Sequence, residues 1–417
     1  MKLFKSFTTY AVSSLLVSGI PFFVLPILTY YLSPYDYGQL TLFSTYVTIL
    51  IPLISLGATG LIGIEYFKKR DREFSRLFSS VARFIFFNFL FVLILTLLFK
   101  NKLEIYLELS PKWVLILPFI VFLSIIVETC YSMIINQKKS FLYGSISVSR
   151  TIIEVSLTLL FIIGIGMRWE GRIFSWLATL FIMTIFSILY FKKEGWILKN
   201  SFDIKQVKKA LIYGIPLVPH ILGRFVINQS DAIFIAKMVS VEDVGIYRIG
   251  YQIGFIVSVL ASVFLNIYSP FLYERLNEIT EKKKIEIVRF SYVFLGLLGF
   301  LVLFLSLSSE TIFSYLIDSR YAAGSQFVFW TSLSYFFWGG YLIFAAYIFY
   351  LKKTIILTYL AIINVILNLG LNYFLIINYG IIGAAYATTI SFFVLFILIT
   401  FISNKLYPMP WLYFLKK

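Results

Sequence analysis

The chain has 417 residues, of which 60% are hydrophobic and only 13% are charged, and its formal net charge is +16. A water-soluble protein of this length does not carry so high an apolar fraction, so a soluble protein is excluded. Long apolar stretches separated by short polar gaps instead predict an all-α polytopic membrane protein. Only a helix or a closed barrel satisfies its own backbone groups in lipid.

In chain order, the apolar stretches predict about twelve transmembrane helices, each long enough to cross the hydrocarbon core. We place these spans at residues 8–32, 38–64, 80–99, 112–136, 144–166, 172–191, 207–236, 245–269, 287–309, 324–350, 355–377 and 382–403. The seventh contains Pro216 and Pro219. Because each proline removes a backbone donor, we expect this helix to break there.

The basic residues indicate the orientation. If the N-terminus is cytoplasmic, most Lys and Arg fall in inner loops, and the outer loops hold only Lys100, Lys102, Lys112, Arg168, Arg172, Lys237, Arg248 and Arg320. Cationic short loops resist translocation, so both termini are predicted to be cytoplasmic. The net charge then reflects topology, and we expect no nucleic-acid partner, since no basic run lies on a soluble domain.

Two short outer turns look alike. Residues 32–38 and 239–247 each carry an acid followed by a glycine that opens the next helix, and a similar echo occurs at 170–171 and 382–383. The repeat predicts two six-helix lobes, residues 1–199 and 200–417, joined by a basic cytoplasmic linker at about 192–209. Parallel repeats of this kind are typical of transporters, with the substrate path between the lobes.

Charged residues inside spans are costly, so each is a candidate functional residue. Glu128, Arg150 and Glu154 lie at similar depths in two neighbouring spans, and Arg150 and Glu154 are four residues apart on one helix face. Two interpretations remain open. The residues form an ion-paired cluster that fixes the helix register, or they form a cation or proton relay in which Arg150 contacts an anion.

Beyond the proline break, polar residues recur on one face of the seventh span. They are His220, Arg224, Asn228 and Asp231. A polar stripe on an interrupted helix is typical of an element that lines a cavity. We expect Arg224 to attract an anionic group, since a guanidinium can bind phosphate in a bidentate manner. Asp231 or His220 would titrate or bind a cation; the alternative is pairing with other helices.

Two further groups lie on single helix faces. Tyr247 and Tyr251, which open the eighth span, are the aromatic pair that we expect to contact a glycan. Asn364, Asn368 and Asn372 follow one face of the eleventh span, where they either hydrogen-bond to neighbouring helices or line a cavity. The chain has a single His, no metal-ligand cluster and no phosphate-binding loop, so we expect no enzyme activity, metal or cofactor.

Several motifs keep a definite order along the chain: 32–38, 213–219, Asp231 followed by an apolar run, 244–247, and 368–369 leading to 379–388. Together they resemble the polysaccharide biosynthesis (Wzx-type) flippases of the multidrug/oligosaccharidyl-lipid/polysaccharide (MOP) superfamily. The resemblance covers nearly the whole chain. It implies the twelve-helix, two-lobe fold of that superfamily, which also contains the MATE transporters, in the bacterial cytoplasmic (inner) membrane.

The resemblance also implies an activity, the movement of an undecaprenyl-pyrophosphate-linked oligosaccharide repeat unit of O-antigen, capsule or exopolysaccharide across the membrane by alternating access. The implied partners are this lipid-linked oligosaccharide, the lipid bilayer, H⁺ or Na⁺, and polysaccharide polymerase and chain-length regulator proteins. Two alternatives remain: a drug/cation antiporter of the same fold, and a membrane polysaccharide polymerase or ligase.

One departure from related proteins concerns the phosphate contacts. Lipid II flippases gather several arginines near their first two spans, whereas the first span here has no charge. This leaves Arg224, Arg150, Lys237 and Arg248 as candidates for contact with the pyrophosphate.

Overall fold

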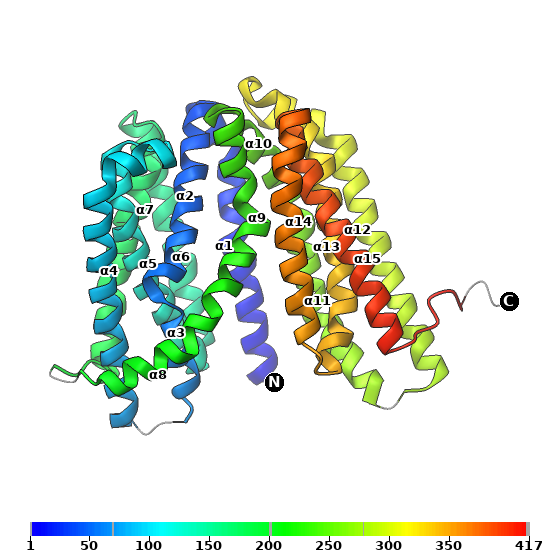
Figure 1. The fold of residues 1–417 in the computed structure, drawn as a ribbon, viewed down its shortest axis with the longest axis horizontal. Coiled ribbons are helices and arrows are strands. Elements are labelled where there is room, and N and C mark those ends of the chain that lie inside the picture. The colour runs from blue at the N-terminus through cyan, green and yellow to red at the C-terminus, as the bar shows by residue number, and fades with distance from the viewer. Residues whose placement is uncertain (1, 69–70, 200–201, 278, 414–417) are drawn as a thin grey trace. The chain divides into compact units, whose positions relative to one another are not determined.

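The computed structural model describes residues 2–68, 71–199, 202–277 and 279–413, and leaves out the side chains of residues 2–11, 14, 15, 18, 21, 71 and 224. In the described residues, all regular structure is helical (Figure 1). The chain divides into two compact units, unit 1 from Met1 to Phe225 and unit 2 from Val226 to Lys417.

Unit 1 begins with the helices of the first six predicted spans. They are α1 (Lys2–Tyr31), α2 (Pro34–Ser55), α3 (Ala58–Glu65), α4 (Asp71–Leu107), α5 (Pro111–Asn136), α6 (Ser140–Leu159), which ends in a π-turn (Leu160–Gly164), and α7 (Trp169–Lys193). Then follow α8 (Ile204–Gly214), a 3₁₀ turn (Ile215–Leu217) and the start of α9 (Val218–Met238). The predicted break at Pro216 is therefore confirmed. A break that was not predicted separates α2 from α3 at Leu56 and Gly57, both with positive φ.

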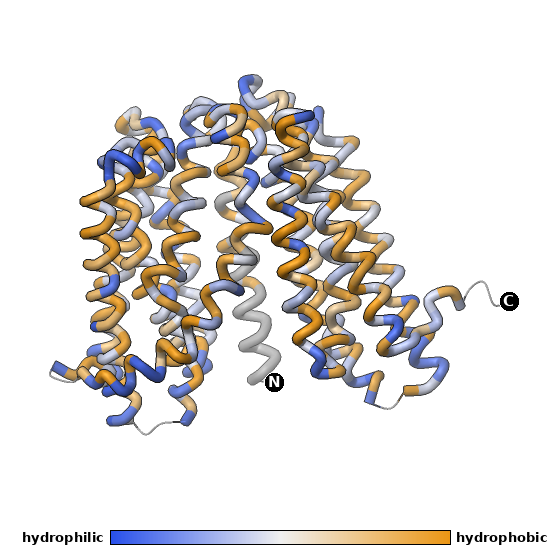
Figure 2. The backbone as a smooth tube through the Cα atoms, in the orientation of Figure 1, coloured by the Kyte–Doolittle hydropathy of each residue, from blue (hydrophilic) through white to orange (hydrophobic). Residues whose placement is uncertain are grey.

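Unit 2 contains the rest of α9 and the remaining spans. These are α10 (Val241–Gly254), α11 (Ile256–Asn277), α12 (Glu281–Leu316), a 3₁₀ turn (Ser319–Gly324), α13 (Ser325–Tyr350), α14 (Ile355–Tyr379) and α15 (Ile382–Leu406). In both units, hydrophobic residues follow the middles of the helices and hydrophilic residues gather near their ends (Figure 2).

The helices match the predicted spans in order. Ten segments of the described chain are long and apolar enough to cross a membrane, and α8 with α9 adds an eleventh when the two count as one interrupted span. In addition, α1 covers the first predicted span over 30 residues. Some helices run well past the predicted limits: α4 has 37 residues where the sequence predicted a span over 80–99.

The packing order repeats between the units. In unit 1, α2 and α4 pack on α5, and α5 and α6 pack on α7; in unit 2, α10 and α12 pack on α13, and α13 and α14 pack on α15. The helix starts repeat as well. Ser33 caps α2 by accepting the N–H of Asp36 at 3.2 Å, and Ser240 caps α10 by accepting the N–H of Asp243 at 3.1 Å. The two similar turns, residues 32–38 and 239–247, thus contain two equivalent N-caps.

The two capping serines differ in the surroundings of the acid that each one contacts, so their removal should have different effects on stability. We expect Ser240→Ala to lower the free energy of unfolding by about 1 kcal/mol, the usual effect of removing an N-cap. Ser33→Ala should lower it more. Ser33 also donates its hydroxyl and N–H to Asp36 at 2.7 and 3.0 Å, and Asp36 is buried and paired with Arg168 at 3.1 Å. Thermal unfolding of both variants in one detergent tests this; a larger loss for Ser240→Ala would contradict it.

The linker and α8 belong to unit 1 and pack on its other helices. The N–H of Asp203 donates to Ser80 at 3.0 Å, and Lys209 pairs with the buried Glu65 at 3.2 Å. The backbones of Gly57 and Gly214 approach so closely that a Cβ on Gly57 would lie 2.5 Å from the carbonyl oxygen of Gly214. The chain therefore passes from unit 1 to unit 2 inside α9, after Phe225, whereas the predicted lobe boundary lies at residue 199.

Candidate functional site

Asp231 is the most deeply buried acid among the described residues of unit 2. It lies in α9 with 2% of its surface exposed. Its Oδ2 accepts the hydroxyl of Tyr247 at 2.8 Å and that of Thr388 at 3.4 Å. Its Oδ1 has no hydrogen-bond partner, and no described basic side chain forms an ion pair with it. A buried carboxylate without a direct ion pair is costly, so Asp231 is a candidate site for a proton or a cation.

The asparagine stripe of α14 lies next to Asp231. Asn368 accepts the hydroxyl of Ser230 at 3.3 Å and the amide of Asn372 at 3.0 Å, and it donates to Ser391 at 3.3 Å. These contacts link α9, α14 and α15. They agree with the first of the two interpretations of the stripe, in which the asparagines hydrogen-bond to neighbouring helices. Asn372 Oδ1 has no hydrogen-bond partner in the described chain. The network thus holds two buried oxygen acceptors without a donor, one on Asp231 and one on Asn372.

The donor chemistry of this network suits a hard cation. It offers carboxylate, amide and hydroxyl oxygens, which are ligands of such cations. In the part of the chain that the structure describes, no group of three or more His, Cys, Asp or Glu side chains could hold a metal ion. A transition-metal centre is therefore not indicated among these residues, whereas a monovalent cation or a proton fits the oxygen set.

Arg248 borders the same network on α10. Its guanidinium carbon lies 4.8 Å from the ring centroid of Tyr251, and it forms no hydrogen bond or ion pair with a described residue. The orientation argument counted Arg248 with the outer-loop cations although the predicted span begins at residue 245; α10 begins still earlier, at Val241. Arg248 therefore lies about 10 Å along the helix. Arg248 lies near enough to attract Asp231, but a partly exposed guanidinium that forms no direct ion pair with a described residue is still a candidate contact for phosphate.

The aromatic pair on α10 is buried. Tyr247 and Tyr251 are 3% and 4% exposed, with ring centroids 5.9 Å apart. The hydroxyl of Tyr251 hydrogen-bonds to that of Tyr335 and to the carbonyl oxygen of Asn228, the latter at 3.4 Å. Both rings thus contribute hydroxyl groups to the polar network and offer little free face for stacking on a sugar.

The polar stripe on α9 is divided between the units. His220 is exposed and belongs to unit 1, whereas Asn228 and Asp231 belong to unit 2. The side chain of Arg224 lies outside the described residues, so its role remains a prediction. The side chain of Asp231 lies in the buried network, to which Asn228 contributes its backbone carbonyl oxygen.

Unit 1 has its own charged residues inside the spans. Arg150 on α6 donates to Glu128 on α5 at 3.0 Å, and its guanidinium carbon lies 5.9 Å from the ring centroid of Tyr131. The Glu128 side chain remains 60% exposed in spite of this pair. Glu128 is eight residues before the end of α5, which places it about 12 Å inside the helix. An exposed charge at such a depth is a candidate contact with a water-filled path.

Glu154 has a different partner from the one that helix spacing suggested. It forms its ion pair with Arg172 on α7 at 2.9 Å, and Arg172 also donates to Thr158 at 2.7 Å. Thr158 in turn shares a hydrogen bond of 2.7 Å with Ser175. The sequence pattern assigned Arg172 to an outer loop, whereas α7 begins at Trp169. These contacts support the register-fixing interpretation for Glu154.

The two acids of unit 1 should respond differently to removal of their charge. Glu154→Gln leaves Arg172 without its partner at a site where the two side chains are only 18% and 26% exposed. We expect a loss of about 1–3 kcal/mol in unfolding free energy, less than for a fully buried pair. Glu128→Gln should cost less than about 1 kcal/mol, since Glu128 is mostly exposed. Thermal unfolding compares them; an equal loss would contradict the assignment.

Several members of these networks were not predicted from the sequence. Ser230, Thr388 and Ser391 surround Asp231 and Asn368, and Arg172 pairs with Glu154. One available signal was the spacing of hydroxyl residues in 383–391, where Thr388 and Ser391 are three apart on one helix face. Arg172 is already the first residue of the predicted sixth span, which was a sign that it belongs to the helix and not to the loop before it.

Comparison with known proteins agrees with the fold. Residues 3–272, more than half of the chain, match the model of the polysaccharide biosynthesis protein family. An uncharacterized membrane protein of Haemophilus influenzae is 25% identical over 377 residues, covering 89% of both chains. The Lsg locus putative protein 1 of the same species is 25% identical over 283 residues, covering 67% of this chain and 68% of that one.

Solved structures show the same architecture. The lipid II flippase MurJ, in an inward closed conformation, superposes with a TM-score of 0.74 at 16% identity and covers 95% of this chain and 87% of that one. An inward-facing multidrug resistance MATE family transporter of the MOP superfamily gives 0.72 at 12% identity, covering 95% and 94%. The predicted two-lobe, MOP-like fold is confirmed. The chain is a multi-pass membrane protein and belongs to the polysaccharide biosynthesis protein family.

Proposed function

We propose that the protein is a flippase that moves a lipid-linked oligosaccharide repeat unit from the inner to the outer leaflet of the bacterial cytoplasmic membrane. The unit would be carried on undecaprenyl pyrophosphate and destined for O-antigen, capsule or exopolysaccharide. The observation that carries the proposal is the unit 2 network inside the spans of a polysaccharide biosynthesis protein. There a buried acid, Asp231, and an arginine, Arg248, lie near enough to attract each other, but neither forms an ion pair with a described residue.

The physical problem of such a substrate explains why these groups are needed. Sugar hydroxyls and a pyrophosphate cannot cross hydrocarbon unaided, because each unpaired polar group costs several kcal/mol there. A protein lowers this barrier by offering a polar path inside the spans while the prenyl tail stays in lipid. The exposure of Glu128 deep in α5 supports such a path, since a charge that faced acyl chains would be costly.

We assign roles within this proposal by chemistry. Arg248, Arg150 and Arg224 would contact the pyrophosphate, since guanidinium groups pair with phosphate oxygens. Asn228 would add a polar contact, while Tyr247 and Tyr251 act through their hydroxyl groups. Asp231 would bind the coupling ion, Na⁺ or H⁺, with Tyr247 and Thr388 donating to one oxygen and the other left to accept the ion. His220 is a second candidate for titration.

The direct test is leaflet exchange in reconstituted vesicles. A fluorescent prenyl-pyrophosphate glycan would be added with an imposed Na⁺ or H⁺ gradient, and the fraction reaching the other leaflet would be measured. A glycolipid of the same sugar without pyrophosphate is the control, and it should exchange much more slowly. No exchange under either gradient would refute the flippase.

A drug/cation antiporter is the second candidate. The observation that favours it is Asp231 itself, because a buried acid would suit a cationic compound as well as an ion. The same vesicles distinguish the two functions. Gradient-driven export of a cationic dye, together with indifference to the lipid-linked sugar, would support the antiporter.

A further inference from the structure

The short helix α8 has two apolar faces. One face, with Val207, Ala210 and Gly214, is buried against unit 1, where α8 packs on α3 and α4. The other face is solvent-accessible: Ile204 is 65% and Ile212 67% exposed. A helix that has already buried one apolar face in its own unit does not normally keep a second one without a partner.

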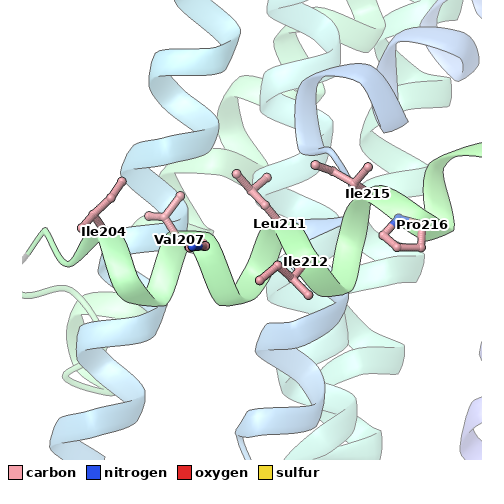
Figure 3. A pocket seen from close by; sticks show the side chains of 7 residues that line it. Ile204, Val207, Leu211, Ile212, Ile215 and Pro216 are labelled. Atoms are coloured by element: carbon pink, nitrogen blue, oxygen red, sulfur yellow. The ribbon is translucent and has the colours of Figure 1, made fainter.

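The second face forms a groove. An open cavity of about 460 Å³ runs along α8, lined by Lys208 and six apolar side chains, one of which, Val207, also belongs to the buried face. Figure 3 shows the side chains of Ile204, Leu211 and Ile215 on the same side of the helix. Lys208 is the one polar side chain among the residues that line this groove.

The charge around this face has one sign. Residues 204–214 contain Lys205, Lys208 and Lys209 and no acid. Lys209 is taken up by its ion pair with Glu65. Lys205 and Lys208 are exposed and form no ion pair with a described residue. The partner of this surface must therefore bring apolar groups to the isoleucines and negative charge to the two lysines.

The position of α8 suits one such partner. Figure 1 shows α8 running crosswise over the lower parts of α3 and α4, at the end of unit 1 where hydrophilic residues gather (Figure 2). An amphipathic helix with lysines beside an apolar face is the pattern of helices that lie in the membrane interface. The long lysine side chains can keep their apolar stems in the interface and extend their charge to phosphates.

We propose that the exposed face of α8 is a binding site for acidic phospholipids of the leaflet on its side of the membrane. Acyl chains contact Ile204, Ile212 and Ile215, and the anionic headgroup contacts Lys205 and Lys208. The site also bears on the interrupted span. Gly214 and Lys209 tie α8 to the α2–α3 segment, and α8 leads directly into α9. A lipid bound on α8 thus holds the start of that span.

A site-specific probe tests the proposal. The chain has one cysteine, Cys130, which is buried, so an Ile212→Cys protein in a Cys130→Ala background takes a fluorophore at α8 alone. The full-length protein in phosphatidylcholine vesicles is then titrated with brominated phosphatidylglycerol or brominated phosphatidylcholine, which quench the fluorophore on contact. Ile215→Cys gives a second, independent reading of the same face.

We expect the brominated phosphatidylglycerol to quench at concentrations lower by about fivefold for each lysine engaged, as for basic residues at an anionic surface. Lys205→Gln/Lys208→Gln should make the two lipids equivalent. The matched control, Lys282→Gln/Lys353→Gln, removes two exposed lysines of unit 2 and should keep the preference. If both lipids quench equally in the protein that keeps Lys205 and Lys208, the face inserts among lipids through its apolar side chains alone. That result would overturn the proposal. Quenching by neither lipid would mean that a protein surface covers the face, which also overturns it.

Discussion

Asp231→Asn is expected to abolish ion-driven transport while the protein still folds and inserts. The substitution keeps the size of the side chain and its hydrogen bond with Tyr247, but it removes the only negative charge of a network that is otherwise amide and hydroxyl. Loss of a residue that merely supports a metal ligand costs about 10–100-fold in affinity. Loss of the charged ligand itself should raise the required ion concentration by more than about 100-fold.

Stability offers a second measurement that does not depend on transport. An ion that binds only the folded protein stabilises it by about 2.7 kcal/mol at a concentration 100 times its dissociation constant. The unsubstituted protein should therefore unfold at a higher temperature as Na⁺ rises, or as pH falls if the ion is H⁺. Asp231→Asn should show neither response. In ion-free buffer it should be at least as stable, because an unpaired buried carboxylate has been replaced by a neutral group.

The control for Asp231 lies on α14. Asn364 is 1% exposed and neither of its amide atoms has a hydrogen-bond partner in the described chain. Asn364→Ala removes a buried polar group one helical turn from Asn368, outside the contacts that reach Asp231. Its ion response should match that of the unsubstituted protein. If Asp231→Asn keeps the response and Asn364→Ala loses it, the ion binds elsewhere on α14 and Asp231 is only a packing residue.

The sequence predicted the features that depend on local chemistry. Runs of apolar residues placed each span, Pro216 placed the break before α9, and the likeness of residues 32–38 and 239–247 corresponds to two equivalent serine caps. Each of these signals lies within one helix or one turn. Hydrophobic content and backbone donors decide such features without reference to the rest of the chain.

The contacts of the candidate site depend on helix order within a unit, which periodicity does not encode. Asp231 meets Thr388 across 157 positions in the sequence, and Ser230 meets Asn368 across 138. The polar faces of α9 and α14 could each be recognised from the sequence. That the two faces share hydrogen bonds could not be predicted from it. Small errors at helix ends also mattered. Arg172 was counted with the outer-loop cations although the predicted span begins at residue 172; it lies three residues inside α7, where it pairs with Glu154.

Arg248→Gln is expected to weaken binding of the pyrophosphate substrate by about 10–100-fold, the range for losing one hydrogen bond to a charged group. The Arg248→Gln protein should lose little stability, because Arg248 has no ion-pair partner among the described residues. The contact of its guanidinium group is with the ring face of Tyr251. The substrate affinity of Arg248→Lys should lie between that of the unsubstituted protein and that of Arg248→Gln. It keeps the charge but loses the planar fork that can hold two phosphate oxygens.

The measurement is the concentration of fluorescent lipid-linked substrate that half-saturates leaflet exchange. Arg275→Gln is the matched control, since Arg275 also stacks on a ring, with its guanidinium carbon 3.8 Å from the centroid of Phe271, but pairs with Glu286 at 3.4 Å. Because the charge of Arg275 is already balanced by Glu286, replacing Arg275 should leave substrate binding unchanged. Equal effects of the two substitutions would mean that both act through loss of a ring contact, and the phosphate would then have to be bound by Arg150 or Arg224.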